Sequence, residues 1–175
     1  MLIKKLTKKE LNGVEFFTSH YGNLGKIDLK TTLVVSISGG KMLKELKKTY
    51  GKEKGEEYFY LLDMMLGSEL GPSWKIYSTY KNSTKPKKEK EEEYYRSFIY
   101  EVLAKVDLKK LILDISETAF KQEKDKVVFL CYENHHEFCH RFILAEDLDI
   151  FVLQQKVNEL FVGDKRQVCI KDRLK

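Results

Sequence analysis

The chain has 175 residues, of which 42% are hydrophobic and 12% aromatic, so it is long enough for one domain with its own core. Its formal net charge of +5 is too small for a dedicated DNA-coating protein, although it permits an acidic partner. The N-terminal residues lack the apolar core of a signal peptide and no run approaches the length of a membrane span, so we expect neither a targeting segment nor a membrane contact.

Two strands are predicted near the start of the chain. Residues 14–18 form the first, and a glycine-containing loop follows at residues 19–25. Residues 31–37 form the second, because they are rich in β-branched side chains. This strand ends at Ser38 and the glycines 39 and 40, which either let backbone amides approach a ligand or form a plain turn.

Several helices are predicted in the middle of the chain. Residues 41–50 carry apolar side chains at helical spacing, whereas the apolar run in residues 56–66 fits either a helix or a strand. Ser73 is placed to cap a short helix. One face of that helix carries Trp74, Tyr77 and Lys81. The lysine-rich segment 82–89 is predicted to be a solvent-exposed loop.

The clearest helical pattern covers residues 91–106, which form one apolar stripe behind an acidic first turn. Asp107 is placed to cap a second helix. Two consecutive helices at this point suit a crossover that packs on the sheet. In the tail, residues 151–161 are predicted to be helical and residues 166–170 to form an edge strand.

Reactive side chains are concentrated in residues 127–141, which contain two cysteines, three histidines, two glutamates and an arginine. The apolar residues up to Leu130 predict a strand buried on both faces, with Cys131 at its carboxyl end. A helix is predicted from Phe138 onward, with Asn134 or Glu137 as its cap.

This strand–loop–helix segment suits an anion. In open α/β sheets, ligands lie beyond the carboxyl ends of the strands, and the start of a helix offers free N–H groups and partial positive charge. Arg141, together with a protonated His140, adds charge at the same place. We therefore predict that a negatively charged ligand binds here, provided that these side chains face the loop.

The sequence Leu130-Cys-Tyr-Glu133, followed by Glu137-Phe-Cys-His-Arg141 and Leu144-Ala-Glu146, resembles the signature of the domain-of-unknown-function 488 family. Shorter matches upstream extend the resemblance over residues 14–148. The resemblance implies an α/β fold in a protein of prokaryotes or their viruses, and it implies no particular activity.

The two cysteines allow two interpretations. Cys131 is a candidate nucleophile at a strand end near several histidines, but a small buried residue at the end of a core strand fits the sequence better. Core packing is also the better interpretation of Cys139. A metal site built on both cysteines and the histidines is the other candidate. Because the Cys-x₇-Cys spacing is not that of a standard zinc knuckle, the sequence predicts no metal site.

The remaining candidate residues are acid–base groups and loop side chains. Glu133 and Glu137 can serve as acid and base, or one can cap the helix while the other pairs with Arg141. The loops after the first two strands should lie at the same sheet edge as Cys131, if all the strands are parallel. The predicted catalytic residues are Cys131, Glu133 and His140, and the predicted ligand-binding residues are Arg141, His20, Tyr21, Asn23 and Ser38.

We therefore predict a single three-layer α/β domain over residues 1–175, with a mainly parallel sheet, a family-like core at residues 14–148 and a C-terminal extension at residues 149–175. The predicted function is to bind or process a phosphorylated ligand, namely a nucleotide or a nucleic-acid end, with the cofactor unknown. One alternative is a non-catalytic module that binds nucleic acid or protein. The other is a thiol- or metal-dependent enzyme that uses Cys131 and Cys139. The odd number of cysteines predicts a reduced, cytoplasmic compartment.

Overall fold

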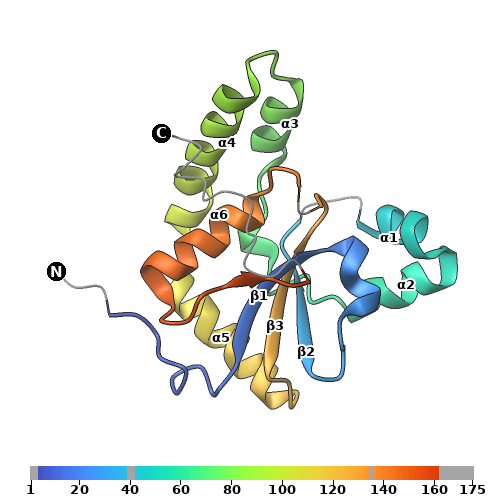
Figure 1. The fold of residues 1–175 in the computed structure, drawn as a ribbon, viewed down its shortest axis with the longest axis vertical. Helices are drawn as coiled ribbons and strands as arrows, with labels where there is room; N and C mark the ends of the chain where they lie inside the picture. The colour runs from blue at the N-terminus through green and yellow to red at the C-terminus, as the bar shows by residue number, and fades with distance from the viewer. Residues whose placement is uncertain (1–3, 39–41, 135, 162–175) are drawn as a thin grey trace.

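Four parallel strands form the central sheet of the chain, in the order β2–β3–β1–β4 (Figure 1). The computed structural model describes residues 4–38, 42–134 and 136–161. The strands are β1 (Glu15–His20), β2 (Thr32–Ser36), β3 (Lys126–Cys131) and the short β4 (Asn158–Glu159). The all-parallel sheet with helices on both faces confirms the predicted α/β class.

Helices occupy most of the rest of the described chain. They are α1 (Met42–Tyr50), α2 (Lys52–Leu61), α3 (Trp74–Asn82), α4 (Lys87–Glu101), α5 (Leu108–Lys121) and α6 (His140–Asp147). Shorter turns are the 3₁₀ segments η1 (Tyr21–Lys26), η2 (Ser68–Leu70) and η3 (Leu103–Lys105) and the π-helical η4 (Leu148–Val152). Two predicted caps are confirmed: Ser73 Oγ accepts from the Ile76 amide, and Asp107 Oδ1 accepts from the Lys110 amide.

The three layers follow from the alternation of side chains along the central strand β3. Val127, Phe129 and Cys131 point into a core under α4, α5 and α6. Val128 and Leu130 point into a second core under η1, α1 and α2. Because both faces are covered, the strand is apolar throughout rather than alternating with polar residues, and this is the pattern that predicted it.

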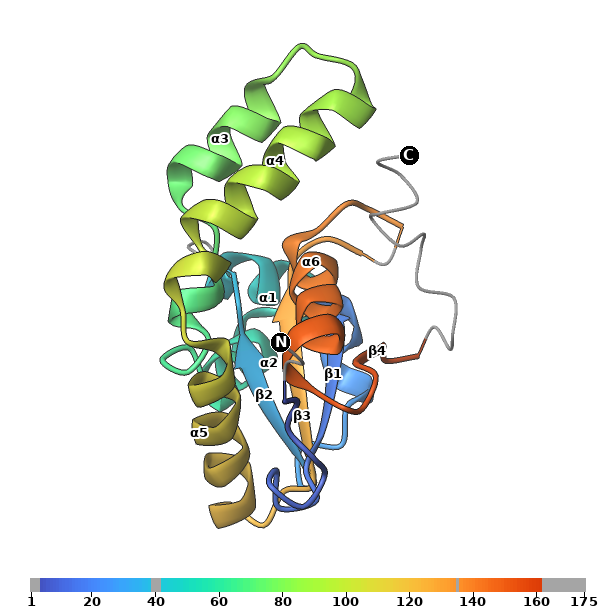
Figure 2. The same cartoon turned by 90° about the vertical axis from the view of Figure 1, so that its left-hand side faces the viewer.

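The carboxyl ends of the strands meet at one edge of the sheet, as parallel pairing requires. His20 at the end of β1 lies beside Cys131 at the end of β3, and Ser36 at the end of β2 lies beside Leu130. The hairpin of α3 and α4 rises beyond this edge, away from the body of the sheet (Figure 2). The edge therefore has a floor of strand ends and a wall of helices.

A loop covers the free edge of β2, the outermost strand on one side of the sheet. The Ser36 amide donates to Asp63 O, and the Asp63 amide donates to Val34 O. Gly67 follows in this loop, and a Cβ atom there would lie 1.8 Å from Ser36 O. Only glycine permits that approach, so Gly67 keeps the loop against β2.

Three predictions for the second half of the chain need correction or fall outside the described residues. The long helix starts at Lys87 and ends at Glu101, so it takes in part of the predicted loop. The predicted helix 151–161 is wrong, because after Val152 the chain extends and enters β4. There Leu153 pairs with Leu6, and this contact with the distant N-terminal segment outweighs local helical spacing. The predicted edge strand 166–170 lies outside the described residues.

Candidate active site

A cavity of about 860 Å³ opens at the carboxyl edge of the sheet, between the strand ends and the α3–α4 hairpin. Such a volume suits a small-molecule ligand. Its described lining comprises His20, Tyr21, Gly22, Ser38, Glu45, Thr49, Pro72, Trp74, Tyr77, Tyr80, Lys81, Tyr94, Cys131, Tyr132, Glu133, Glu137, Phe138, Cys139 and His140. The walls are thus rich in aromatic side chains, and most of the reactive side chains come from the segment 131–140.

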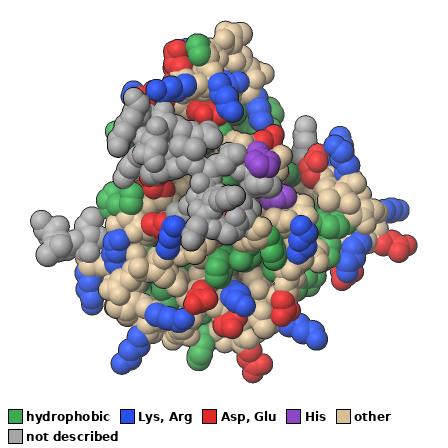
Figure 3. All heavy atoms as spheres, in the orientation of Figure 1, with side chains coloured by type: hydrophobic (Ala, Val, Ile, Leu, Met, Phe, Trp, Pro, Cys, Tyr) green, Lys and Arg blue, Asp and Glu red, His purple; other side chains and the backbone are tan. Residues whose placement is uncertain are grey.

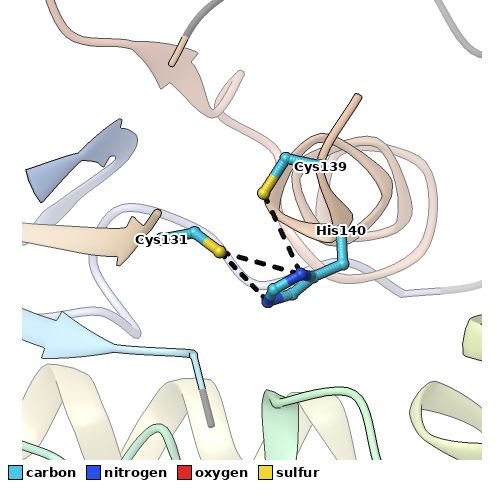
Figure 4. A group of neighbouring side chains, drawn as sticks. All are labelled: Cys131, Cys139 and His140. Carbon is cyan, nitrogen blue, oxygen red and sulfur yellow. Dashed lines mark hydrogen bonds between the residues drawn. The ribbon is translucent and has the colours of Figure 1, made fainter. Parts of the chain in front are cut away.

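The floor of this cavity is formed by Cys131, Cys139 and His140, whose side chains point toward one another (Figure 4). Cys131 ends β3, while Cys139 and His140 begin α6. His140 Nδ1 lies 3.7 Å from Cys131 Sγ and 3.9 Å from Cys139 Sγ. We call these three residues the thiol–imidazole floor. The strand end and the helix start bring together the residues that sequence analysis had singled out.

A hydrogen bond to a backbone carbonyl fixes the orientation of the His140 ring. Its Nε2 lies 2.7 Å from Ile37 O, and since a carbonyl can only accept, Nε2 carries a proton and donates. Nδ1 lies 3.9 Å from Cys139 Sγ and 3.4 Å from Tyr94 Oη, whereas Cys131 Sγ lies at nearly equal distances from the two ring nitrogens, 3.7 Å from Nδ1 and 3.6 Å from Nε2. The ring also packs against Phe98, with centroids 5.2 Å apart. Because Nε2 is committed to Ile37 O, Nδ1 is the ring nitrogen left for other interactions.

The pKa values of the two buried thiols are shifted in opposite directions. Burial raises the pKa of Cys131 well above its usual value, and the negative charge at Cys139 adds to this effect. Burial by itself would also raise the pKa of Cys139, but the hydrogen bond from Cys131 and the charges of Arg141 and His140 outweigh it and bring that pKa well below its usual value. Of the two, Cys139 is therefore the group that ionises more readily to a thiolate, with Cys131 as its thiol neighbour.

Glu133 stands beside this thiolate with an altered acidity of its own. Its Oε2 lies 3.3 Å from Cys131 Sγ, so it competes with Cys139 for the single hydrogen of the Cys131 thiol. Burial raises the pKa of its carboxyl group, and the charge of Cys139 raises it further. A raised pKa makes a carboxyl group a better proton donor and acceptor in acid–base catalysis.

Arg141 does not face the cavity, and the expectation of an open cationic corner is wrong. Its side chain is fully buried and pairs with Glu159 of β4, with Nη2 3.2 Å from Oε1. Its other bonds run to the carbonyls of Glu133 and Asn134, at 2.6 and 3.1 Å. The guanidinium is enclosed because a buried carboxylate on β4, far along the chain, compensates its charge.

The loop between Cys131 and Cys139 is held by its own polar groups. Glu137 Oε2 accepts from the Asn134 amide, and Asn134 Oδ1 accepts from the His136 amide. The predicted capping of α6 by one of these two residues is therefore wrong, since Cys139 occupies the N-cap position without a side-chain cap. The carboxylate and the amide close the loop instead, and this fixes the spacing of the two cysteines.

The candidate residues from the predicted loops after the first two strands do not all lie at the cavity. His20, Tyr21 and Ser38 line the cavity. Tyr21 Oη lies 2.7 Å from the hydroxyl oxygens of both Ser36 and Ser38, which joins the ends of β1 and β2. Asn23 is buried, donates to Ser19 Oγ at 3.2 Å and is not among the described lining residues. Whether His20, Tyr21 and Ser38 contact a ligand stays a prediction.

Comparison with known proteins matches residues 45–150 to a family described as the active DUF488-N3 subclade. This match covers more than half of the chain. The chain belongs to the DUF488 family. The matched residues contain the whole thiol–imidazole floor and the α3–α4 hairpin, whereas β1, β2 and β4 lie outside the match. No curated protein and no solved structure matches the chain.

Sequence reasoning missed several residues of the DUF488 cavity. Trp74, Tyr77 and Tyr80 line its wall from α3, and Tyr94 from α4. The spacing of three between the α3 aromatic residues was a usable signal, because it puts them on one helix face. The approach of Tyr94 to His140 had no signal in the sequence, since it depends on how the hairpin packs.

The charged surface of this DUF488 member shows no single basic patch on the face in Figure 3, where Lys and Arg side chains are spread around the outline and interspersed with acids. Several lysines of the hairpin are paired with glutamates, including Lys85 with Glu89 and Lys87 with Glu91.

Within the described part of the chain, no helix is both long and apolar enough to cross a membrane.

Proposed function

We propose that the chain is an enzyme that acts on a small, flat, aromatic ligand lacking phosphate, such as a nucleobase or nucleoside. The thiol–imidazole floor supplies its reactive centre. The observation that carries the proposal is the position of Cys131, Cys139 and His140 at the bottom of a cavity with aromatic walls. Glu133 is the group that transfers protons to and from the ligand.

The aromatic walls support a flat ligand. The rings of Trp74 and Tyr77 lie 5.7 Å apart on α3, and Trp74 is 73% exposed although it borders the cavity. Stacking of a base on an aromatic side chain is worth about 1–3 kcal/mol. Tyrosine hydroxyls can also bond to the polar edge of a heteroaromatic ring.

The charges around the cavity argue against the phosphorylated ligand expected from the sequence. That expectation required an open Arg141, and its guanidinium is buried. The described lining contains three glutamates, Glu45, Glu133 and Glu137, but one lysine, Lys81. The Lys81 ammonium lies over the Tyr77 ring, 5.4 Å from its centroid. A phosphate dianion would meet more negative than positive charge there. We therefore favour an uncharged or cationic ring.

The first experiment uses Trp74, the only tryptophan of the chain, as a fluorescent reporter. Purine and pyrimidine nucleosides should quench it, and their monophosphates should bind more weakly. Tyr77→Leu should weaken nucleoside binding by about 1–3 kcal/mol, whereas Tyr100→Leu, on an exposed tyrosine of α4 that is not among the described lining residues, should leave it unchanged. If the monophosphates bind more tightly than the nucleosides, the proposal is wrong and the cavity holds a phosphate site.

The second experiment tests for catalysis. The wild-type protein is incubated with each nucleoside that quenches Trp74, and products are detected by mass spectrometry. Turnover should be lost in Cys139→Ser while quenching remains. Binding to single-stranded nucleic acid that falls steeply with salt, together with no nucleoside quenching, would instead support the alternative of a non-catalytic nucleic-acid module.

A further inference from the structure

The thiol–imidazole floor also has the chemistry of a metal site. In the described chain, Cys131, Cys139 and His140 form a group whose ligand atoms all lie within 4.8 Å of one another. Thiolate and imidazole are the ligands that zinc prefers, whereas magnesium and calcium prefer oxygen. We propose that these three residues bind one Zn²⁺ ion, with the fourth position open to the cavity. The inference rests on the proposed function only in assigning the ion to the same reactive centre.

The sulfur–nitrogen distances are near those of a zinc site. In a tetrahedral site with Zn–S bonds of about 2.3 Å and Zn–N bonds of about 2.0–2.1 Å, a sulfur and a nitrogen ligand lie roughly 3.5–3.6 Å apart. His140 Nδ1 lies 3.7 Å from Cys131 Sγ and 3.9 Å from Cys139 Sγ. These atoms are thus only a few tenths of an ångström farther apart than in a loaded zinc site.

One side-chain adjustment is required. Cys131 Sγ lies 3.6 Å from His140 Nε2, almost as near as it lies to Nδ1. The sulfur must therefore turn toward the Nδ1 lone pair before both can bind one ion. We expect a rotation about the Cys131 side chain to bring the sulfur there, while the bond to Ile37 O holds the His140 ring in place.

The surroundings support the ion as they do in known zinc sites. A histidine that binds a metal through one nitrogen almost always donates its other N–H to a carbonyl, carboxylate or water, and His140 Nε2 donates to Ile37 O. The loop between the cysteines is fastened by Glu137 and by Arg141. The protein therefore fixes both the direction of the imidazole and the separation of the sulfurs.

The charges around the floor also balance. Two thiolates neutralise a divalent cation, so the three-residue site carries no net charge when loaded. Arg141, whose charge acts on both cysteines, is already paired with Glu159. A buried charge is tolerated when it is compensated in this way. Glu133 lies beside Cys131, close enough to exchange protons with a water molecule or ligand at the fourth position.

Cobalt substitution tests the site without any substrate. Chelator-treated, reduced protein in a Cys169→Ser background, which removes the third cysteine of the chain, is titrated with Co²⁺. We expect one ion per chain, sulfur-to-cobalt charge-transfer absorption and the visible bands of tetrahedral cobalt, with Zn²⁺ displacing the cobalt. We expect three variants to weaken cobalt binding: Cys131→Ser, Cys139→Ser and His140→Gln. Each should weaken it by more than roughly 10- to 100-fold, which is the effect of removing only a hydrogen bond that supports a metal ligand.

His136→Gln is the matched control, because this histidine lies in the same loop but outside the cavity lining. It should bind Co²⁺ as wild type does. Circular dichroism checks that each variant is folded, and the wild-type charge-transfer band decides the matter even if a variant unfolds. Absence of that band with fully reduced thiols, or equal loss in His136→Gln, overturns the metal site. Nucleoside quenching of Trp74 in the metal-free protein is measured separately, so failure of the metal site is distinguishable from failure of the proposed function.

Discussion

Cys139 and Cys131 are equally buried, yet their thiols differ in acidity because of what surrounds each sulfur. Cys139 receives a hydrogen bond from Cys131 and feels the charges of Arg141 and His140. Cys131 has only a weaker influence of Arg141, against burial and two negative neighbours, Cys139 and Glu133. One strand end and one helix start thus make Cys139 the more acidic of two neighbouring thiols. The sequence favoured core packing for both cysteines, although it also placed Cys131 among the predicted catalytic residues.

This asymmetry predicts a pH dependence in the metal-free protein. The pKa of Cys139 is lowered, so its thiolate should persist below the ordinary thiol pKa of about 8.5 and disappear only as pH falls through the lower, folded value. At pH 7, Cys139→Ser in the Cys169→Ser background should therefore lose ultraviolet thiolate absorbance. Cys131→Ser should keep it, because its hydroxyl preserves the hydrogen bond. Thiolate absorbance that is unaffected by Cys139→Ser at pH 7 would contradict the assignment.

Helices α1 and α2 show how one residue sets the contact between elements. They pack closely beside the sheet, and Gly55 of α2 lies at their crossing. A Cβ atom at Gly55 would lie 2.6 Å from the Lys47 backbone nitrogen. The backbones can approach so closely only because residue 55 has no side chain. This pair of helices covers the second core, beneath the η1 turn that carries Tyr21.

Gly55→Ala should therefore destabilise the protein, which reverses the usual effect of this substitution in a helix. In a helix interior, alanine is normally more favourable than glycine by about 0.8–1.0 kcal/mol. Here the added methyl group forces the helices apart, at a cost of roughly 1–3 kcal/mol. Chemical denaturation measures the change. Glu53→Ala, an exposed position of the same helix, should change the stability little, and a stabilised Gly55→Ala would show that the helices are not in contact there.

At the scale of the whole molecule, the sequence predicts what depends on neighbouring residues and misses what depends on distant ones. The three main strands and the caps Ser73 and Asp107 follow from local patterns. The meeting of Cys131, Cys139 and His140 follows in outline from one continuous segment. The burial of Arg141 does not, because its partner Glu159 lies on β4, in a region where spacing favours a helix. Tyr94 similarly reaches His140 through the packing of α4.

The Arg141–Glu159 pair connects α6, β4 and the loop that carries Glu133, so its loss should affect the whole fold. Arg141→Met leaves the buried Glu159 carboxylate without compensation, which typically costs about 3–5 kcal/mol. Urea unfolding should show this loss. Arg96→Met, which removes an exposed pair with Glu92 on α4, should cost less than about 1 kcal/mol. If both variants lose the same small amount of unfolding free energy, the Arg141–Glu159 pair does not hold the fold together. Arg141 would then be available to bind an anionic ligand.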